Sequence, residues 1–77
     1  MNNDFSKIEK YVIASDVGSR DGIGVEIYSG ETMLIEIFRD DTKKKMEVKL
    51  YQKELDWELV EQAIALFKKE IPSEYED

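Results

Sequence analysis

The sequence predicts an α+β fold: a four-stranded antiparallel β-meander with one C-terminal α-helix packed on one face. Three segments between residues 22 and 52 alternate apolar and polar side chains with the period of a half-buried strand. Short polar turns separate these segments, as in hairpins. From residue 56 the apolar period lengthens to that of an amphipathic helix.

The four strands are expected near residues 10–18, 22–29, 32–40 and 44–52. In the last three strands, the alternation assigns one set of apolar side chains to the face under the helix. This inward set is Ile23, Val25, Ile27, Met33, Ile35, Ile37, Met46, Val48 and Leu50.

The first strand is less regular than the other three. KYVIASDV is rich in β-forming residues, and GSRDG after it suits a polar turn. Phe5, Ile8 and Val12 are spaced three and four apart, however, which also fits a short helix or a packed irregular arm. The structure of residues 1–9 is therefore left open between these alternatives and a longer strand.

The helix is expected from about residue 56 to residue 71, with Asp56 as its N-cap. Pro72 disfavours its continuation, and residues 72–77 form an acidic tail that is expected to be flexible. The apolar stripe of the helix consists of Val60, Ala63, Ile64, Phe67 and Ile71, widened by Leu59 and Leu66.

Length and composition indicate one small domain that spans residues 1–77. The chain has no cysteine, so disulfides cannot stabilise it. No apolar run approaches the length of a membrane span, and MNNDFSKIEK lacks the apolar centre of a signal peptide. We therefore expect a cytoplasmic protein that does not engage a membrane.

The net charge of −7 is concentrated in the last third of the chain. Residues 1–53 hold 10 acidic and 9 basic side chains, whereas residues 54–77 hold 8 acidic and 2 basic ones. Such a surface repels nucleic-acid phosphates, since nucleic-acid binding uses clustered lysine and arginine. A basic protein is the partner that this charge favours.

The stretch RDDTKK after the third strand is interpreted as the turn of a hairpin. Short side-chain oxygens of Asp and Thr bond nearby backbone N–H groups in turns. As a metal site, Asp40 and Asp41 would need further ligands, because the calcium-loop spacing D-x-[DN]-x-[DN]-G is absent. No metal site is predicted here.

The chain has neither histidine nor cysteine, which excludes Ser–His and Cys–His nucleophiles. Glu26, Glu36 and Glu47 could form a carboxylate row across three strands, but a solvated sheet face with Lys49 or another lysine relieving the repulsion explains them more simply. We therefore predict no enzyme, no catalytic residue and no cofactor.

Four outward residues give the opposite sheet face more apolar surface than solvation requires: Tyr28, Leu34, Phe38 and Tyr51. Either the N-terminal arm covers them with Phe5, Ile8 and Tyr11, or they bind a partner or a second copy of the chain. An unpaired edge strand is another route to a homodimer.

Trp57, at the start of the helix, is expected at the edge of the core, with an interface anchor as the alternative. Glu58 and Glu61 on the exposed helix surface would form the polar rim of an interface with a basic partner.

The segments EIFRDD and VKLY, followed by a helix with an acidic cap, resemble a type of small bacterial protein of uncharacterised function. The resemblance covers about two thirds of the chain and includes no catalytic motif. Some proteins of this type belong to toxin-neutralising, immunity-like sets, which implies an interaction role. The expected function is a non-enzymatic protein-interaction module, such as an immunity or inhibitor protein acting on a basic partner. The alternative is a small carboxylate-based enzyme or metal-binding module.

Overall fold

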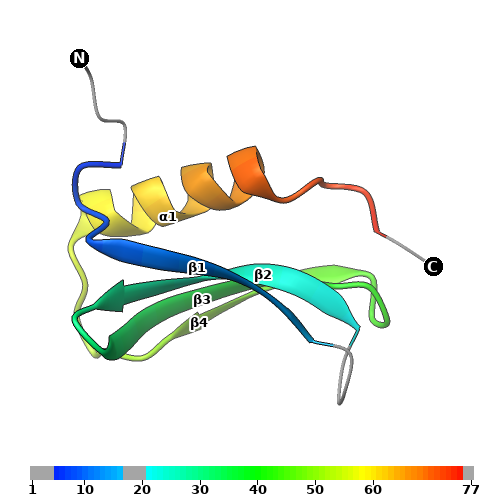
Figure 1. The fold of residues 1–77 in the computed structure, drawn as a ribbon, viewed down its shortest axis with the longest axis horizontal. Coiled ribbons are helices and arrows are strands. Elements are labelled where there is room, and N and C mark those ends of the chain that lie inside the picture. The colour runs from blue at the N-terminus through cyan, green and yellow to red at the C-terminus, as the bar shows by residue number, and fades with distance from the viewer. Residues whose placement is uncertain (1–4, 17–20, 76–77) are drawn as a thin grey trace.

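The computed structural model describes residues 5–16 and 21–75, and it confirms the α+β fold. One antiparallel sheet has the strand order β1-β2-β3-β4, and one helix lies along one of its faces (Figure 1). Residues 17 and 18, the expected end of the first strand, lie outside the described ranges. The elements are β1 (Lys10–Asp16), β2 (Gly22–Ser29), β3 (Thr32–Asp40), β4 (Lys45–Leu50) and α1 (Trp57–Glu70).

A bulge in β3 changes which side chains face the helix. Ile27 pairs with Ile35, but the next residue, Tyr28, pairs with Met33, so Leu34 is an extra residue in the ladder. Paired residues share a face, and Met33 therefore lies on the outer face with Tyr28. Leu34 packs, partly buried, against the core on the helix side. The expected directions of Met33 and Leu34 are wrong, because one inserted residue reverses the alternation beyond it.

The hydrophobic core lies between α1 and the two central strands. Ile64, expected in the helix stripe, is more than a third exposed, and Val60 is only partly buried. The inward residues expected on β2 are in or against the core, as are Ile35 and Ile37 of β3. The buried cluster consists of Val25, Ile27, Ile35, Ile37, Leu59, Ala63, Leu66, Phe67 and Ile71.

β4 is not covered by the helix. Its residues Met46, Val48 and Leu50 share the helix-side face, because Val48 pairs with Ile37 and Leu50 with Ile35. They are nevertheless 39%, 52% and 56% exposed. The backbone of α1 approaches β2 and β3 only. The expectation that these three β4 residues belong to the core is therefore wrong.

Residues 5–9 form an arm that packs on the helix side, beside β1. Phe5 and Ile8 contact the core cluster, and the backbone N–H of Lys7 donates to the side chain of Gln62 at 2.8 Å. Glu9 accepts from the backbone N–H of Gly30 at 2.7 Å. The alternative in which this arm covers the outer face is wrong.

Both ends of α1 follow the sequence closely. Asp56 is the N-cap, and its side chain accepts from the backbone N–H of Glu58 at 2.8 Å. The helix ends at Glu70, two residues before Pro72. No helix in the described ranges combines the length and the apolar character that a bilayer crossing requires.

Candidate functional site

Phe38 lies on the outer face but is only 2% exposed. It pairs with Gly24 on β2, and its ring covers Gly22 and Gly24. A Cβ at Gly24 would overlap the carbonyl oxygen of Ile37 and lie 2.9 Å from Phe38 Cδ1. The two glycines thus provide the space that buries this ring against the sheet. Phe38 is part of the packing of the outer face, and the expectation that it is an exposed anchor is wrong.

The carboxylates of the outer face form a shorter row than expected. Glu26 pairs with Glu36, which pairs with Lys49, whereas Glu47 lies opposite Phe38. Lys49 is thus the third member of the row, where its charge offsets the carboxylate repulsion. Glu47 forms an ion pair with Lys45 on its own strand at 3.2 Å.

Tyr28 belongs to the same face and donates its hydroxyl to Glu26 at 2.9 Å. This hydrogen bond, followed by desolvation and the negative charges of Glu26 and Glu36, raises the pKa of Tyr28 above its ordinary value of 10.0. The phenol is therefore a weaker acid than a free tyrosine, which is unfavourable for a catalytic proton donor at neutral pH. Tyr51 is half exposed on the same face.

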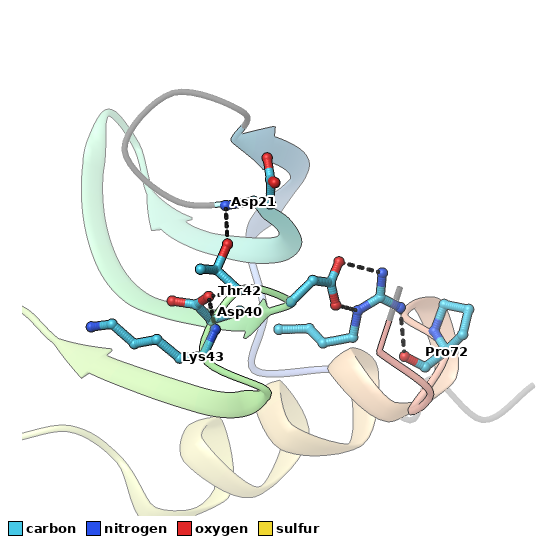
Figure 2. Close-up of polar contacts among 7 residues, drawn as sticks. Asp21, Asp40, Thr42, Lys43 and Pro72 are labelled. Carbon is cyan, nitrogen blue, oxygen red and sulfur yellow. Dashed lines mark hydrogen bonds and ion pairs between the residues drawn. The ribbon is translucent and has the colours of Figure 1, made fainter. Parts of the chain in front are cut away.

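The turn between β3 and β4 is held from within by Asp40. Its Oδ1 accepts from the backbone N–H groups of Thr42 and Lys43 at 3.0 and 2.9 Å (Figure 2). The carboxylate is buried, and its Oδ2 has no hydrogen-bond partner among the described residues. The backbone N–H of Asp21 donates to the Thr42 hydroxyl at 3.4 Å, which ties this turn to the start of β2. RDDTKK thus contains the predicted hairpin turn, which residues 41–44 form, while Arg39 and Asp40 are the last residues of β3.

Arg39, which precedes this turn, is a buried cation that joins the sheet to the end of α1. Its Nε and Nη2 donate to the two carboxylate oxygens of Asp41 at 2.9 and 3.2 Å. Its Nη1 donates to the carbonyl oxygen of Pro72 at 2.9 Å, an interaction drawn in Figure 2. The segment after α1 is therefore attached to the sheet at Pro72. Further along, the Lys44 ammonium lies 6.0 Å from the ring centre of Tyr75. These hydrogen bonds compensate for the burial of Arg39 and Asp41, so both residues have a structural role.

Within residues 5–16 and 21–75, no group of three or more His, Cys, Asp or Glu side chains is arranged to hold a metal ion. Asp40 uses its Oδ1 on the turn, and Asp41 uses both of its carboxylate oxygens on Arg39. The hydrogen bonds of these two carboxylates thus have a structural role, in the turn and in the ion pair with Arg39.

A groove between α1 and β4, which we call the open groove, differs from a solvated surface because much of its lining is apolar. It has a volume of about 460 Å³. Met46 and Val48 line it from β4, and Ile64, Phe67 and Ile71 line it from the helix side. Lys68 and Lys69 also line it, although the Lys69 ammonium lies 5.5 Å from the ring centre of Phe5 in the N-terminal arm. The open groove exists because α1 lies over β2 and β3 and leaves β4 uncovered.

Trp57 extends the apolar side of this groove toward the start of the helix. Trp57, Glu61, Ile64 and Lys68 follow one another at intervals of four, three and four residues, so they lie along one side of α1. Ile64 and Lys68 line the open groove, which places Trp57 and Glu61 on the groove side one to two turns earlier. Trp57 is 74% exposed, so its expected place at the edge of the core is wrong.

The residues expected at an interface are thus separated by the structure. Leu34 is partly buried against the core and Phe38 is buried on the outer face, while Tyr28 and Tyr51 remain accessible on the outer face. Trp57, Glu58 and Glu61 remain exposed on α1. The open groove was not predicted from the sequence, although an apolar row on an edge strand beneath a single helix could have indicated it.

Comparisons with protein families, curated proteins and solved structures found no significant match to this chain.

Proposed function

We propose that the protein is a non-enzymatic protein-binding module, an inhibitor or immunity-like protein, and that the Trp57 end of the open groove binds a basic partner protein. The observation that supports this proposal is the exposure of Trp57 on the side of α1 that faces the apolar open groove, about two helical turns before Ile64, the first helix residue that lines it. A large aromatic side chain left in water costs free energy that burial against a partner recovers. Buried tryptophans are among the residues that contribute most to binding energy at protein interfaces.

The charge around Trp57 favours a basic partner. Glu58 and Glu61 are exposed on the first two turns of α1, and Glu54 is exposed just before it. These carboxylates would accelerate association with a positively charged surface, and salt would weaken the effect. Lys68 at the other end of the groove limits the basic contact to the Trp57 end.

The carboxylate-based enzyme has less support from the geometry. Glu26 and Glu36 are paired across strands, with Lys49 next in the row. The hydroxyl of Tyr28 is already donated to Glu26. The two carboxylates thus have partners on a sheet face, and the groove on the other face is the more distinctive surface.

The test compares affinity capture by the wild type and three variants from extracts of the organism of origin, quantified by mass spectrometry. The variants are Trp57→Ala, Glu58→Lys/Glu61→Lys, and a charge-matched control, Asp21→Lys/Glu74→Lys, at the opposite end of the sheet. We expect a basic protein that the wild type and the control capture and that Trp57→Ala loses.

The kinetics of the purified complex then separate the two contributions. Trp57→Ala should increase the dissociation rate about 30-fold, because it removes an apolar anchor. The double charge reversal should slow association and flatten its salt dependence. A partner that all three variants bind at the wild-type rates would show that the Trp57 end of the groove is not the binding site.

A further inference from the structure

The open edge of β4 presents a regular set of backbone groups. The backbone N–H of Tyr51 donates to the carbonyl oxygen of Leu34 at 3.0 Å, which makes Leu50 and Ile35 a non-hydrogen-bonded pair of the ladder. The N–H and C=O groups of Leu50, Val48 and Met46 therefore point away from β3. In the described part of the chain, no other strand pairs with this side of β4.

The side chains of β4 alternate between an apolar and a charged face. Met46, Val48 and Leu50 are on the helix side and exposed. Glu47 and Lys49 are on the outer face, with opposite charges two residues apart. A long edge of this kind pairs readily with another strand unless charge or shape prevents it.

We propose that β4 pairs antiparallel with β4 of a second copy of this chain, about a two-fold axis at Val48. In this register Val48 lies opposite Val48 of the second copy, and Met46 lies opposite its Leu50. Glu47 then lies opposite Lys49 of the second copy, and the symmetry repeats this ion pair on the other side of the axis. The backbone groups that point outward from Met46, Val48 and Leu50 meet their counterparts in hydrogen-bonded pairs.

Charge selects this register over its neighbours. A shift of the pairing by two residues in one direction places Glu47 opposite Glu47, and in the other direction it places Lys49 opposite Lys49. Like charges directly opposite on a sheet are destabilising. A shift by one residue would place the apolar row of one copy on the charged face of the other.

The resulting dimer is closed. A two-fold axis at β4 uses this edge in both copies and produces one continuous sheet with a β1 strand at each end. The helices of both copies lie on the same face, and the apolar rows of the two β4 strands become neighbours on the floor between them. Trp57 stays outside the strand pairing, so dimerisation is separable from the binding of a basic partner.

Sedimentation velocity across a wide range of protein concentrations tests the proposal. We expect the wild type to form a dimer, and both Glu47→Lys and Lys49→Glu to raise its dissociation constant about tenfold or more, because each places like charges opposite one another twice. The double variant Glu47→Lys/Lys49→Glu keeps the net charge and exchanges the two signs, and it should restore the wild-type dimer.

Val48→Pro provides an independent test with a different readout. The N–H of Val48 points away from β3, so proline removes no bond of the existing ladder but blocks the pairing at the axis. Circular dichroism should show a folded chain that sediments as a monomer. A wild type that is monomeric at high concentration would overturn the proposal, as would a dimer that is insensitive to the single charge reversals.

Discussion

The burial of single side chains follows from their position relative to α1 more than from their residue type. Ile35 and Leu50 are paired directly across β3 and β4 on the same face. Ile35 is fully buried, whereas Leu50 is more than half exposed. The two are therefore a matched pair for measuring what coverage by the helix contributes to stability.

Ile35→Ala should lower the free energy of unfolding by about 2 to 5 kcal/mol, since it removes buried methyl groups and leaves a cavity. Leu50→Ala should cost less than about 1 kcal/mol, because its side chain is already largely in water. Urea denaturation at a concentration at which both variants sediment as monomers measures the difference. Equal losses of stability would mean that the helix covers β4 as well.

Tyr28 makes stability depend on pH at alkaline values. Its pKa is raised in the folded chain by the bond to Glu26, so the folded state holds this proton more tightly than the unfolded state. The stabilisation is present below pH 10 and is lost as the pH rises through the raised pKa. Ultraviolet titration should show one of the four tyrosines ionising late.

Two substitutions test the cause of that shift. Glu26→Gln should return the late ionisation toward the ordinary tyrosine value, and Tyr28→Phe should remove it altogether. Tyr51→Phe, on the same face, serves as the control. If Glu26→Gln left the late ionisation unchanged, the hydrogen bond to Glu26 would not be its main cause.

At the scale of elements, the buried side chain of Arg39 connects β3 to the chain just after α1, and Asp41 forms an ion pair with it. The side chains of Arg39 and Asp41 are 3% and 9% exposed. Arg39 also bonds the carbonyl oxygen of Pro72, just beyond the helix. A guanidinium at this position is favourable as well because helix C-termini carry partial negative charge.

Arg39→Met should cost about 3 to 5 kcal/mol, because it leaves the buried Asp41 carboxylate without this cation. The double variant Arg39→Met/Asp41→Asn should be less destabilised than the sum of its single variants, since it also removes the remaining charge. Thermal and chemical denaturation of all four proteins gives the coupling energy. Strict additivity would show that the two side chains do not act as a pair.

The sequence predicts which elements form better than it predicts how they cover one another. Period-two alternation identified β2, β3 and β4, and Asp56 and Pro72 identified the limits of α1. The bulge at Leu34 has no glycine or proline to mark it, so the alternation gave the wrong face for Met33 and Leu34. Phe38 was missed as a buried residue because its shelter comes from glycines on the neighbouring strand.

The position of the groove could not be predicted for a reason of size. A helix with its side chains is about 10 to 12 Å wide, and strands are about 4.8 Å apart, so one helix covers two or three of four strands. Alternation says which face of a strand is apolar but not whether a helix lies above it. The exposed apolar row on β4 and the exposure of Trp57 both follow from the position of α1 over β2 and β3.

At the scale of the whole molecule, the two flanks of α1 differ. On the β1 side, the N-terminal arm closes the core with Phe5 and Ile8. It is attached to the helix by Lys7, which bonds Gln62 and forms an ion pair with Asp56 at 3.6 Å. On the β4 side, the open groove remains, with Met46 and Ile64 both 39% exposed.

This asymmetry predicts that apolar side chains on the β1 flank stabilise the folded monomer, whereas those on the β4 flank stabilise association with another chain. Ile8→Ala should lower the free energy of unfolding by about 1 to 3 kcal/mol, because it removes partly buried surface that seals the core. Met46→Ala should leave the stability of the monomer within about 1 kcal/mol of the wild type and weaken association instead, since its side chain loses water only when another chain lies against β4. Denaturation at low protein concentration and sedimentation at high concentration measure the two effects on the same samples. A variant at Ile8 as stable as the wild type would show that the arm does not seal the core, and an Ile8 variant that changed only association would assign the arm to the interface.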